Sequence, residues 1–158
     1  MHPNEQLIQT FYAAFKARQP EEMSACYHDE VTFSDPVFEN LEGPEVGMMW
    51  RMLCRQAATL EIQATNISAD DERGSADWVA IYPFGKANRK VHNKIHAEFR
   101  FKDGQIFSHV DTFDFWKWSR MALGPLGLFL GWNSVVKVNI QKQAMTNLRK
   151  FITITKTT

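Results

Sequence analysis

The spacing of apolar residues changes near residue 60, and this change constrains the fold more than any other feature of the chain. In residues 7–15, apolar side chains recur every three or four positions, which is the spacing of an amphipathic helix. From Leu60 to Trp116 they alternate with polar residues, which is the spacing of half-buried strands. Helices followed by a run of strands predict an α+β fold with an antiparallel meander.

Three helices are expected in the first part of the chain. The first begins at Asn4, a typical capping residue, and runs to about Arg18. The second lies in "RQPEEMSACYHDE", with Pro20 in its first turn, and the third opens at Gly43-Pro44. A short strand, Val31–Ser34, separates the second helix from the third and ends at Asp35-Pro36.

Four strands follow, separated by the turn sequences "DDERG", "GKANR" and "KDG". We place them at Leu60–Ala69, Ser75–Phe84, Val91–Phe101 and Gln105–Trp116. Two helical patterns complete the chain, "WKWSRMALG" and "NSVVKVNIQKQAMTNLRKF". These helices are expected to cover the sheet or a cavity mouth, or to pair with another subunit.

Composition excludes several classes of function. Eighteen basic and eighteen acidic residues cancel, so no net field favours nucleic acid or an anionic membrane. No apolar run approaches the ~20 residues of a membrane span, and the N-terminus lacks a signal-peptide pattern, so we expect a cytoplasmic protein. The apolar window Met121–Trp132 is rich in Gly and Pro and is interpreted as a packed or lid-like segment.

No motif indicates a cofactor or a metal. Cys26 and Cys54 lie in neither a CxxC pair nor a ligand-like spacing with histidine. The glycines of "GPLGLFLG" follow no strand of the phosphate-binding type, and the chain has no GxSxG nucleophile motif. We therefore expect neither a metal site nor a bound cofactor.

The element order and the segment "QTFYAAFKARQPEEMSACYHDEVTFSDPV" resemble the nuclear transport factor 2-like, or SnoaL-like, superfamily. The resemblance covers about residues 4–116 of a single domain, 1–158, and leaves 117–152 as a C-terminal helical extension. It implies a cone-shaped, cystatin-like fold, in which a curved antiparallel sheet is wrapped by N-terminal helices around an apolar cavity. It also implies a homodimer formed through the outer face of the sheet.

Asp35 is the first candidate site residue. From the residues alone, Asp35-Pro36 is typical of a strand end followed by a turn. In the resemblance, Asp35 aligns with the general-base aspartate of bacterial ketosteroid isomerase. That enzyme's oxyanion-hole tyrosine and protonated aspartate are replaced by Phe11 and Ala97, so steroid isomerisation is not expected.

His109 and Asp111 are the second candidates. In "SHVDTFDFW", alternation places both residues on one strand face, together with Phe113. An imidazole titrates near neutral pH, and a carboxylate two residues away can orient it. We expect His109 to shuttle a proton, Asp111 to orient it and Asp35 to act as the second base. A hydrogen-bonded His–Asp pair with a structural role is the alternative.

These residues predict a pocket for a small hydrophobic, oxygenated molecule. Its expected ligand-binding residues are Tyr12, Trp50, Trp78, Asn93 and Phe113. The function expected from the resemblance is cofactor-free acid–base chemistry of the isomerase, cyclase, dehydratase or epoxide hydrolase type. The alternative is a non-catalytic module that binds a small ligand or a protein.

Overall fold

The computed structural model describes residues 1–56, 59–125 and 134–157. The chain begins with helices α1 (Pro3–Lys16) and α2 (Pro20–Ala25), strands β1 (Tyr27–Ser34) and β2 (Leu41–Glu42), and helix α3 (Pro44–Gln56). Strands β3 (Glu61–Ala69), β4 (Arg73–Phe84), β5 (Arg89–Lys102) and β6 (Gln105–Thr112) follow, and then helices α4 (Phe115–Leu123) and α6 (Ser134–Lys156). The predicted α+β class is confirmed.

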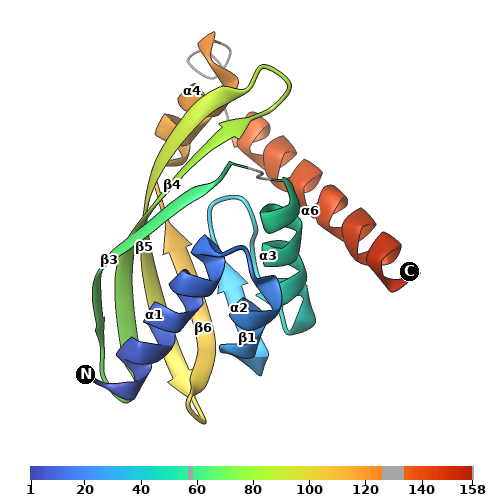
Figure 1. Ribbon diagram of the computed structural model, residues 1–158. Coiled ribbons are helices and arrows are strands. Elements are labelled where there is room, and N and C mark those ends of the chain that lie inside the picture. Colours follow the sequence, from blue (N-terminus) through green and yellow to red (C-terminus); the bar gives the residue numbers. More distant parts are fainter. Residues whose placement is uncertain (57–58, 126–133, 158) are drawn as a thin grey trace.

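The six strands form one curved sheet in the order β2-β1-β6-β5-β4-β3, and Figure 1 shows how it bends around the helices. Strands β3 to β6 are the predicted antiparallel meander. Strand β1 joins this meander in parallel with β6, with Phe33 opposite His109 and Ser34 opposite Val110. This register places Asp35, the next residue of the chain, beside the strand that carries His109 and Asp111.

Helices α1 and α3 cover the concave face of the sheet (Figure 1). Along β5 every second residue from Val91 to Phe99 is buried, and the alternating residues from His92 to Glu98 are exposed. The core is rich in aromatic rings that meet edge to face, as in the contact of Phe15 with Trp50, whose ring centroids are 5.0 Å apart. His109 lies within this core, and its ring centroid is 5.6 Å from that of Phe11.

The start of α1 differs from the prediction. The helix is capped by His2, whose Nδ1 accepts a hydrogen bond from the backbone N–H of Asn4 at 3.1 Å. Pro3 follows as the first helical residue, a position at which its missing N–H costs nothing. The side chain of Asn4 instead donates to the carbonyl of Asp70 at 2.8 Å and so ties α1 to the β3–β4 turn.

The last strand is shorter than predicted, and the second helix ends earlier. Strand β6 stops at Thr112, because the Asp114 side chain accepts a hydrogen bond from the backbone N–H of Lys117 at 3.0 Å and caps α4. Near the start of the chain, helix α2 ends at Ala25, and β1 already begins at Tyr27. The predicted strand Val31–Ser34 is therefore only the second half of a longer one.

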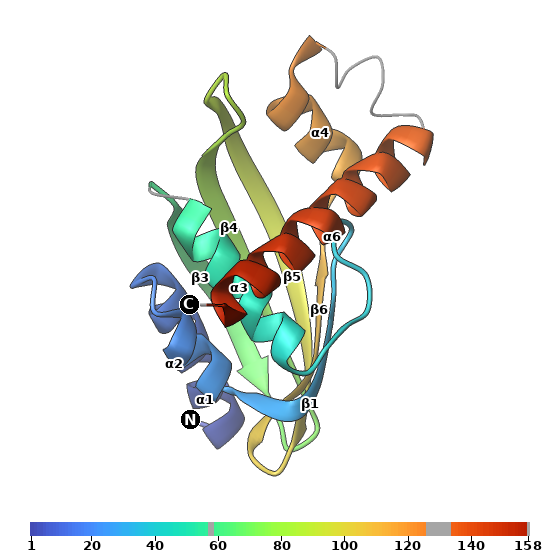
Figure 2. The ribbon, with the colours of Figure 1, turned by 90° about the vertical axis from the view of Figure 1, so that its right-hand side faces the viewer.

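Two C-terminal helices border the open end of the sheet. Helix α4 contacts β5, and α6 contacts α3, which it crosses in Figure 2. Leu148 of α6 is fully buried, and the Arg55 guanidinium of α3 lies 5.5 Å from the centre of the Phe151 ring. Residues 126–132 of the expected packed or lid-like segment lie outside the described residues.

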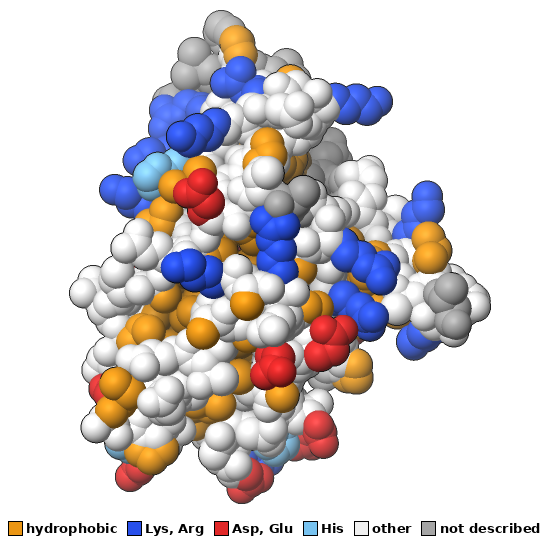
Figure 3. Space-filling view, in the orientation of Figure 1, with side chains coloured by type: hydrophobic (Ala, Val, Ile, Leu, Met, Phe, Trp, Pro, Cys, Tyr) orange, Lys and Arg blue, Asp and Glu red, His pale blue; other side chains and the backbone are white. Residues whose placement is uncertain are grey.

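The surface carries charges of both signs. In the view of Figure 3, Lys and Arg side chains gather toward the upper half, and Asp and Glu lie nearer the centre and the lower end. Among the described residues, no helix combines the length and apolar character needed to cross a membrane.

Candidate functional site

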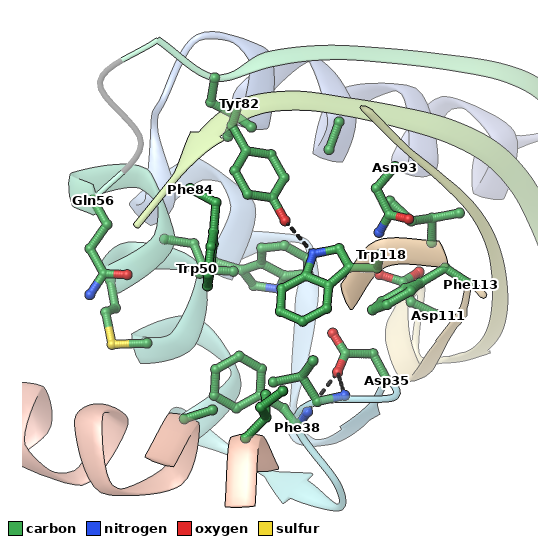
Figure 4. Close-up of a pocket in the computed structure, with 18 of the residues that line it drawn as sticks. Asp35, Phe38, Trp50, Gln56, Tyr82, Phe84, Asn93, Asp111, Phe113 and Trp118 are labelled. Atoms are coloured by element: carbon green, nitrogen blue, oxygen red, sulfur yellow. Dashed lines mark hydrogen bonds between the residues drawn. The ribbon is translucent and has the colours of Figure 1, made fainter. Parts of the chain in front are cut away.

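A pocket of about 460 Å³ opens between the concave face of the sheet and helices α3, α4 and α6 (Figure 4). Its wall is mainly aromatic and aliphatic, with rings from α1, α3, β4 and α4. The polar side chains in the described lining are few and are Asp35, Gln56, Tyr82, Asn93, Asp111, Gln143 and Asn147, with the indole groups of Trp50, Trp78 and Trp118. An apolar wall with a few convergent polar groups is typical of a small-molecule site.

Asp35 combines the turn role and the pocket role that the sequence left open. Its backbone N–H donates to the carbonyl of Phe38 at 2.8 Å, which closes the turn after β1. Its Oδ1 accepts from the backbone N–H groups of Val37 at 2.7 Å and Phe38 at 2.6 Å. These bonds hold the carboxyl group so that it points into the pocket (Figure 4).

The environment of Asp35 favours its neutral form. Burial raises the pKa of this carboxyl from its ordinary 3.8 to about 7, and the nearby Asp111 carboxylate also raises it. The hydrogen bonds from Phe38 and Val37 act in the opposite direction and only partly offset the effect. The residue is half-buried and lines the pocket, so the carboxyl group is only partly enclosed. At neutral pH Asp35 can therefore donate a proton as well as accept one.

His109 and Asp111 form the predicted pair on β6. His109 Nε2 lies 2.9 Å from Asp111 Oδ1, and the same oxygen accepts from Trp78 Nε1 at 3.3 Å. His109 has no exposed surface, and Asp111 is 2% exposed. Asp111 belongs to the pocket wall, whereas His109 lies behind it and outside the lining. The structure thus brings Asp35 and Asp111 to one pocket and places His109 in its supporting layer.

A hydrogen-bonded chain behind the pocket determines the state of His109. Trp50 Nε1 donates to the Tyr27 hydroxyl oxygen at 2.8 Å, and this hydroxyl lies 2.8 Å from His109 Nδ1. Because Tyr27 accepts from an indole that can only donate, its own proton is directed to Nδ1. We therefore assign the neutral Nε2–H tautomer to His109, with Nε2 donating to Asp111.

The five predicted ligand-binding residues divide into two groups. Trp50, Trp78, Asn93 and Phe113 line the pocket. Tyr12 does not, because its ring packs behind the wall, 5.8 Å from Trp78 between ring centroids. Its hydroxyl is buried and has no hydrogen-bond partner among the described residues. Burial, with a further contribution from Asp111, raises the pKa of Tyr12 well above its ordinary value.

Many residues in and behind the pocket wall were not predicted from the sequence, and three of them, Tyr27, Tyr82 and Trp118, make side-chain hydrogen bonds there. Tyr27 orients His109, and Trp118 of α4 donates from Nε1 to the Tyr82 hydroxyl at 2.8 Å across the pocket wall. Tyr82 could have been found, because it shares a face of β4 with Trp78 at a spacing of four residues. No comparable signal in the sequence marks Tyr27 or Trp118.

No group of three or more His, Cys, Asp or Glu side chains within the described ranges is arranged to hold a metal ion. Cys26 and Cys54 are free, buried thiols. Burial raises the pKa of Cys26 to about 11, so this thiol is protonated and unreactive at neutral pH. The carboxyl groups of Asp35 and Asp111 therefore carry the acid–base capacity of the pocket.

Comparison with known proteins identifies the fold and the family. The family model described as SnoaL-like domain matches residues 8–109. TerC co-crystallised with polyporic acid has a TM-score of 0.67 and 14% identity, over 77% of this chain and 99% of TerC. An LEH-like epoxide hydrolase from M. tuberculosis has a TM-score of 0.62 and 18% identity, over 81% of this chain and 93% of its own.

A hypothetical protein from Catenulispora acidiphila DSM 44928 in complex with trimethylamine has a ketosteroid isomerase-like fold. It matches with a TM-score of 0.65 and 13% identity, over 75% of this chain and 93% of its own. A search of curated proteins found no match. At these identities the structural likeness establishes the fold alone, whereas the family model covers more than half of the sequence. The chain therefore belongs to the SnoaL-like domain family.

Proposed function

We propose that this protein is a cofactor-free enzyme that performs acid–base chemistry on a small, hydrophobic, oxygenated molecule. The observation that carries the proposal is the convergence of two carboxyl groups, Asp35 and Asp111, on one aromatic-lined pocket. Their surroundings differ, since Asp111 accepts from two buried side-chain donors and Asp35 only from backbone N–H groups. Paired carboxyl groups in different environments are suited to opposite roles in proton transfer.

In this proposal Asp35 is the proton donor and Asp111 the proton acceptor. The raised pKa of Asp35, about 7, keeps much of this carboxyl group protonated at neutral pH. A general acid is most effective when its pKa lies near the pH at which it works. Asp111 accepts hydrogen bonds from the Nε2–H of His109 and the indole N–H of Trp78, an arrangement that suits a proton acceptor. His109 is then a positioning residue rather than the shuttle expected from the sequence, because it has no surface in the pocket.

A proton donor facing a proton acceptor across an apolar cavity suits several reactions. It can open an epoxide, remove water from an alcohol, move a double bond beside a carbonyl or close a ring. These are the isomerase, cyclase, dehydratase and epoxide hydrolase types. The fold neighbours named as an epoxide hydrolase and as a complex with polyporic acid support a small organic substrate.

The test is a substrate panel with an epoxide, a β-hydroxy ketone and a β,γ-unsaturated ketone, each on a hydrophobic ring. On any substrate that is turned over, Asp35→Asn and Asp111→Asn should each lower kcat/KM at least ~100-fold, the usual contribution of a general acid or base. Asp77→Asn is the matched control, because Asp77 lies on the exposed face and bonds to His96 and Asn66. Unchanged turnover in both pocket variants would refute the proposal.

The second candidate is a non-catalytic module that binds a small ligand or a protein. It is favoured by the sealed position of His109 and by the mainly apolar pocket wall. Native mass spectrometry of the purified protein separates the two candidates. A ligand that co-purifies, is retained by Asp35→Asn and is not converted by the wild-type protein would favour binding alone.

The homodimer is also a proposal, drawn from the resemblance. Size-exclusion chromatography with light scattering tests it directly, because one chain has a mass of 18.3 kDa. A dimer should give twice that mass, and a concentration-independent monomer would contradict the proposal.

A further inference from the structure

The described wall of the pocket contains acids but no cationic side chain. Asp35 and Asp111 are its only carboxyl groups, and none of its described residues is Lys, Arg or His. The residues outside the description, 57–58, 126–133 and 158, include no Lys, Arg or His in the sequence. A carboxylate removed from water is costly unless an opposite charge or several donors compensate it. This pocket therefore has an electrostatic imbalance that its own side chains do not correct.

Three cations of neighbouring elements make contacts outside the pocket. Arg89 of β5 donates from Nε to the carbonyl of Met121 at 3.0 Å. The ammonium group of Lys137 lies 5.3 Å from the centre of the Phe115 ring, and Arg55 lies over the ring of Phe151. None of these three residues belongs to the described lining.

Each pocket carboxyl group also keeps one oxygen without a protein donor. Both hydrogen bonds to the Asp35 side chain arrive at Oδ1, from Val37 and Phe38. Both hydrogen bonds to Asp111 likewise arrive at Oδ1, from His109 and Trp78. Over the described part of the chain, the two Oδ2 atoms receive no hydrogen bond. They are the acceptor positions that remain for a ligand.

His109 does not neutralise Asp111. A protonated imidazole would need the Tyr27 oxygen to accept from both Trp50 and His109 Nδ1, and the Tyr27 proton would then have no acceptor among the described residues. The neutral tautomer uses every donor of the chain once. With this assignment, no cationic side chain among the described residues lies beside Asp111.

Aromatic rings surround the two carboxyl groups. Trp50, Trp78, Trp118 and Phe113 all contribute to the wall, and Figure 4 shows the Trp118 ring beside Asp35, with Asp111 and Phe113 close by. Indole faces attract cations through their quadrupole, most strongly where water is excluded. Aromatic walls with a nearby carboxylate are the usual recognition chemistry for organic ammonium ions.

We propose that the ligand of this pocket carries one cationic nitrogen, a protonated tertiary amine or a quaternary ammonium, on a hydrophobic body. The inference rests on the proposed function, since it assigns a substrate class to the same pocket. The cationic nitrogen lies against Asp111 and the tryptophan rings, and its single charge balances that carboxylate. Asp35 then remains available as the proton donor for the oxygenated part of the molecule.

Isothermal titration with a matched pair of probes tests this inference. Phenyltrimethylammonium and tert-butylbenzene have the same shape and differ only in charge. The wild-type protein should bind the ammonium at least tenfold more tightly than its uncharged isostere. Asp111→Asn should remove at least tenfold of the affinity for the ammonium and leave the affinity for tert-butylbenzene unchanged, because the amide oxygen still accepts from His109 and Trp78.

Asp77→Asn is the control, since it removes a carboxylate from the outer face, and it should alter neither affinity. Equal affinities, tighter binding of tert-butylbenzene, or no saturable binding of the ammonium at millimolar concentration would overturn the inference. Neither probe is turned over, so this result is independent of the kinetic test of Asp35 and Asp111. Loss of turnover of an uncharged substrate in those variants, without a preference for the ammonium, would leave the proposed function intact and refute only the ligand class.

Discussion

The two sides of the Asp111 carboxylate differ in how completely their polar groups are paired. On the closed side, the polar atoms of Trp50, Tyr27, His109 and Trp78 form one continuous chain that ends on Oδ1 of Asp111. On the pocket side, the remaining oxygens of Asp35 and Asp111 have no donor among the described residues. A fully paired network is rigid, whereas unpaired groups are available for chemistry. The residues on the closed side therefore hold Asp111 in position, and the oxygens on the pocket side remain available to a ligand.

Asp111 and Asp35 also differ in which groups hold them in position. Asp111 is held by side chains that come from α3, β1, β4 and β6, directly or through His109, so its position depends on the whole core. Asp35 is held only by backbone N–H groups two and three residues further along the chain. Substitutions on the two sides should consequently differ in kind, with large losses of stability on the closed side and gains or small changes on the pocket side.

The largest effect is expected from Asp111→Ala. This change leaves the Nε2–H of His109 and the indole N–H of Trp78 buried without an acceptor, at about 1–3 kcal/mol for each group. We expect the free energy of unfolding, measured by urea denaturation, to fall by about 3–5 kcal/mol. Asp111→Asn, which keeps an acceptor oxygen, should lose clearly less. Similar losses in the two variants would show that the network is not what holds the closed side.

Tyr27→Phe should have the next largest effect. Removal of the hydroxyl leaves the indole N–H of Trp50 and Nδ1 of His109 unpaired, so unfolding free energy should fall by about 2–3 kcal/mol. The ¹⁵N chemical shifts of the His109 ring should move away from those of a fixed Nε2–H tautomer. Tyr12→Phe is the matched control, because the Tyr12 hydroxyl is buried and finds no hydrogen-bond partner in the described part of the chain, so its loss should be neutral or stabilising. Equal costs for the two tyrosines would contradict the proposed chain.

Asp35→Asn should stabilise the protein in a pH-dependent manner. The pKa of Asp35 is about 7 when folded, above its ordinary 3.8, so ionisation at higher pH penalises the folded state. A rise in pKa from 3.8 to about 7 corresponds to about 4 kcal/mol, which we reduce to about 2 kcal/mol because the side chain is only partly enclosed. The gain in unfolding free energy should be complete above pH 7 and should disappear as the pH falls to 4.

Asp77→Asn should change the unfolding free energy in the opposite direction to Asp35→Asn. Hydrogen bonds from His96 and Asn66 lower the pKa of Asp77, so its carboxylate stabilises the folded state above the ordinary pKa and loses that effect as the pH falls. Asp77→Asn should therefore destabilise the protein at neutral pH. Between about pH 5 and 8 the loss for Asp77→Asn should stay constant and should shrink only below about pH 4, whereas the gain for Asp35→Asn should grow as the pH rises from about 4 to 7. A gain for Asp35→Asn that does not change with pH would refute the assigned environment of Asp35.

Much of the candidate site could be predicted from the sequence, because it depends on the local spacing of residues. Alternation along "SHVDTF" placed His109, Asp111 and Phe113 on one face, and the resemblance gave Asp35 a reason to face a cavity. Alternation does not encode depth along the sheet, however. His109 and Asp111 share a face, yet one lies in the sealed core and the other at the pocket wall.

The remaining features depend on contacts between distant residues. Tyr27 and His109 are 82 residues apart, and their hydrogen bond follows from the parallel pairing of β1 with β6, which no local pattern indicated. Tyr27 was instead assigned to the preceding helix. The C-terminal helices were expected to cover the sheet or a cavity mouth, or to pair with another subunit, and α6 does contribute to the pocket wall. Which of its residues do so could not be predicted, because the resemblance ends before that helix begins.

The smallest effect is expected from Gln141→Ala, which tests whether α6 controls the pocket side alone. Gln141 of α6 donates from Nε2 to the carbonyl of Pro36 at 3.0 Å and to Glu39 Oε1 at 3.1 Å, so it holds the turn that positions Asp35. Both bonds lie near the surface, and unfolding free energy should fall by only about 0.5–1 kcal/mol. Amide hydrogen exchange at Val37 and Phe38 should nevertheless accelerate, because their bonds to Asp35 depend on that turn.

Thr153→Ala is the control for Gln141→Ala. It removes a hydrogen bond to the carbonyl of Arg149 on the same helix and should leave the exchange of Val37 and Phe38 unchanged. The ¹⁵N shifts of His109 should stay the same in both variants, since the closed side does not depend on α6. A change in the His109 tautomer would show instead that the two sides of Asp111 are coupled through the C-terminal helix.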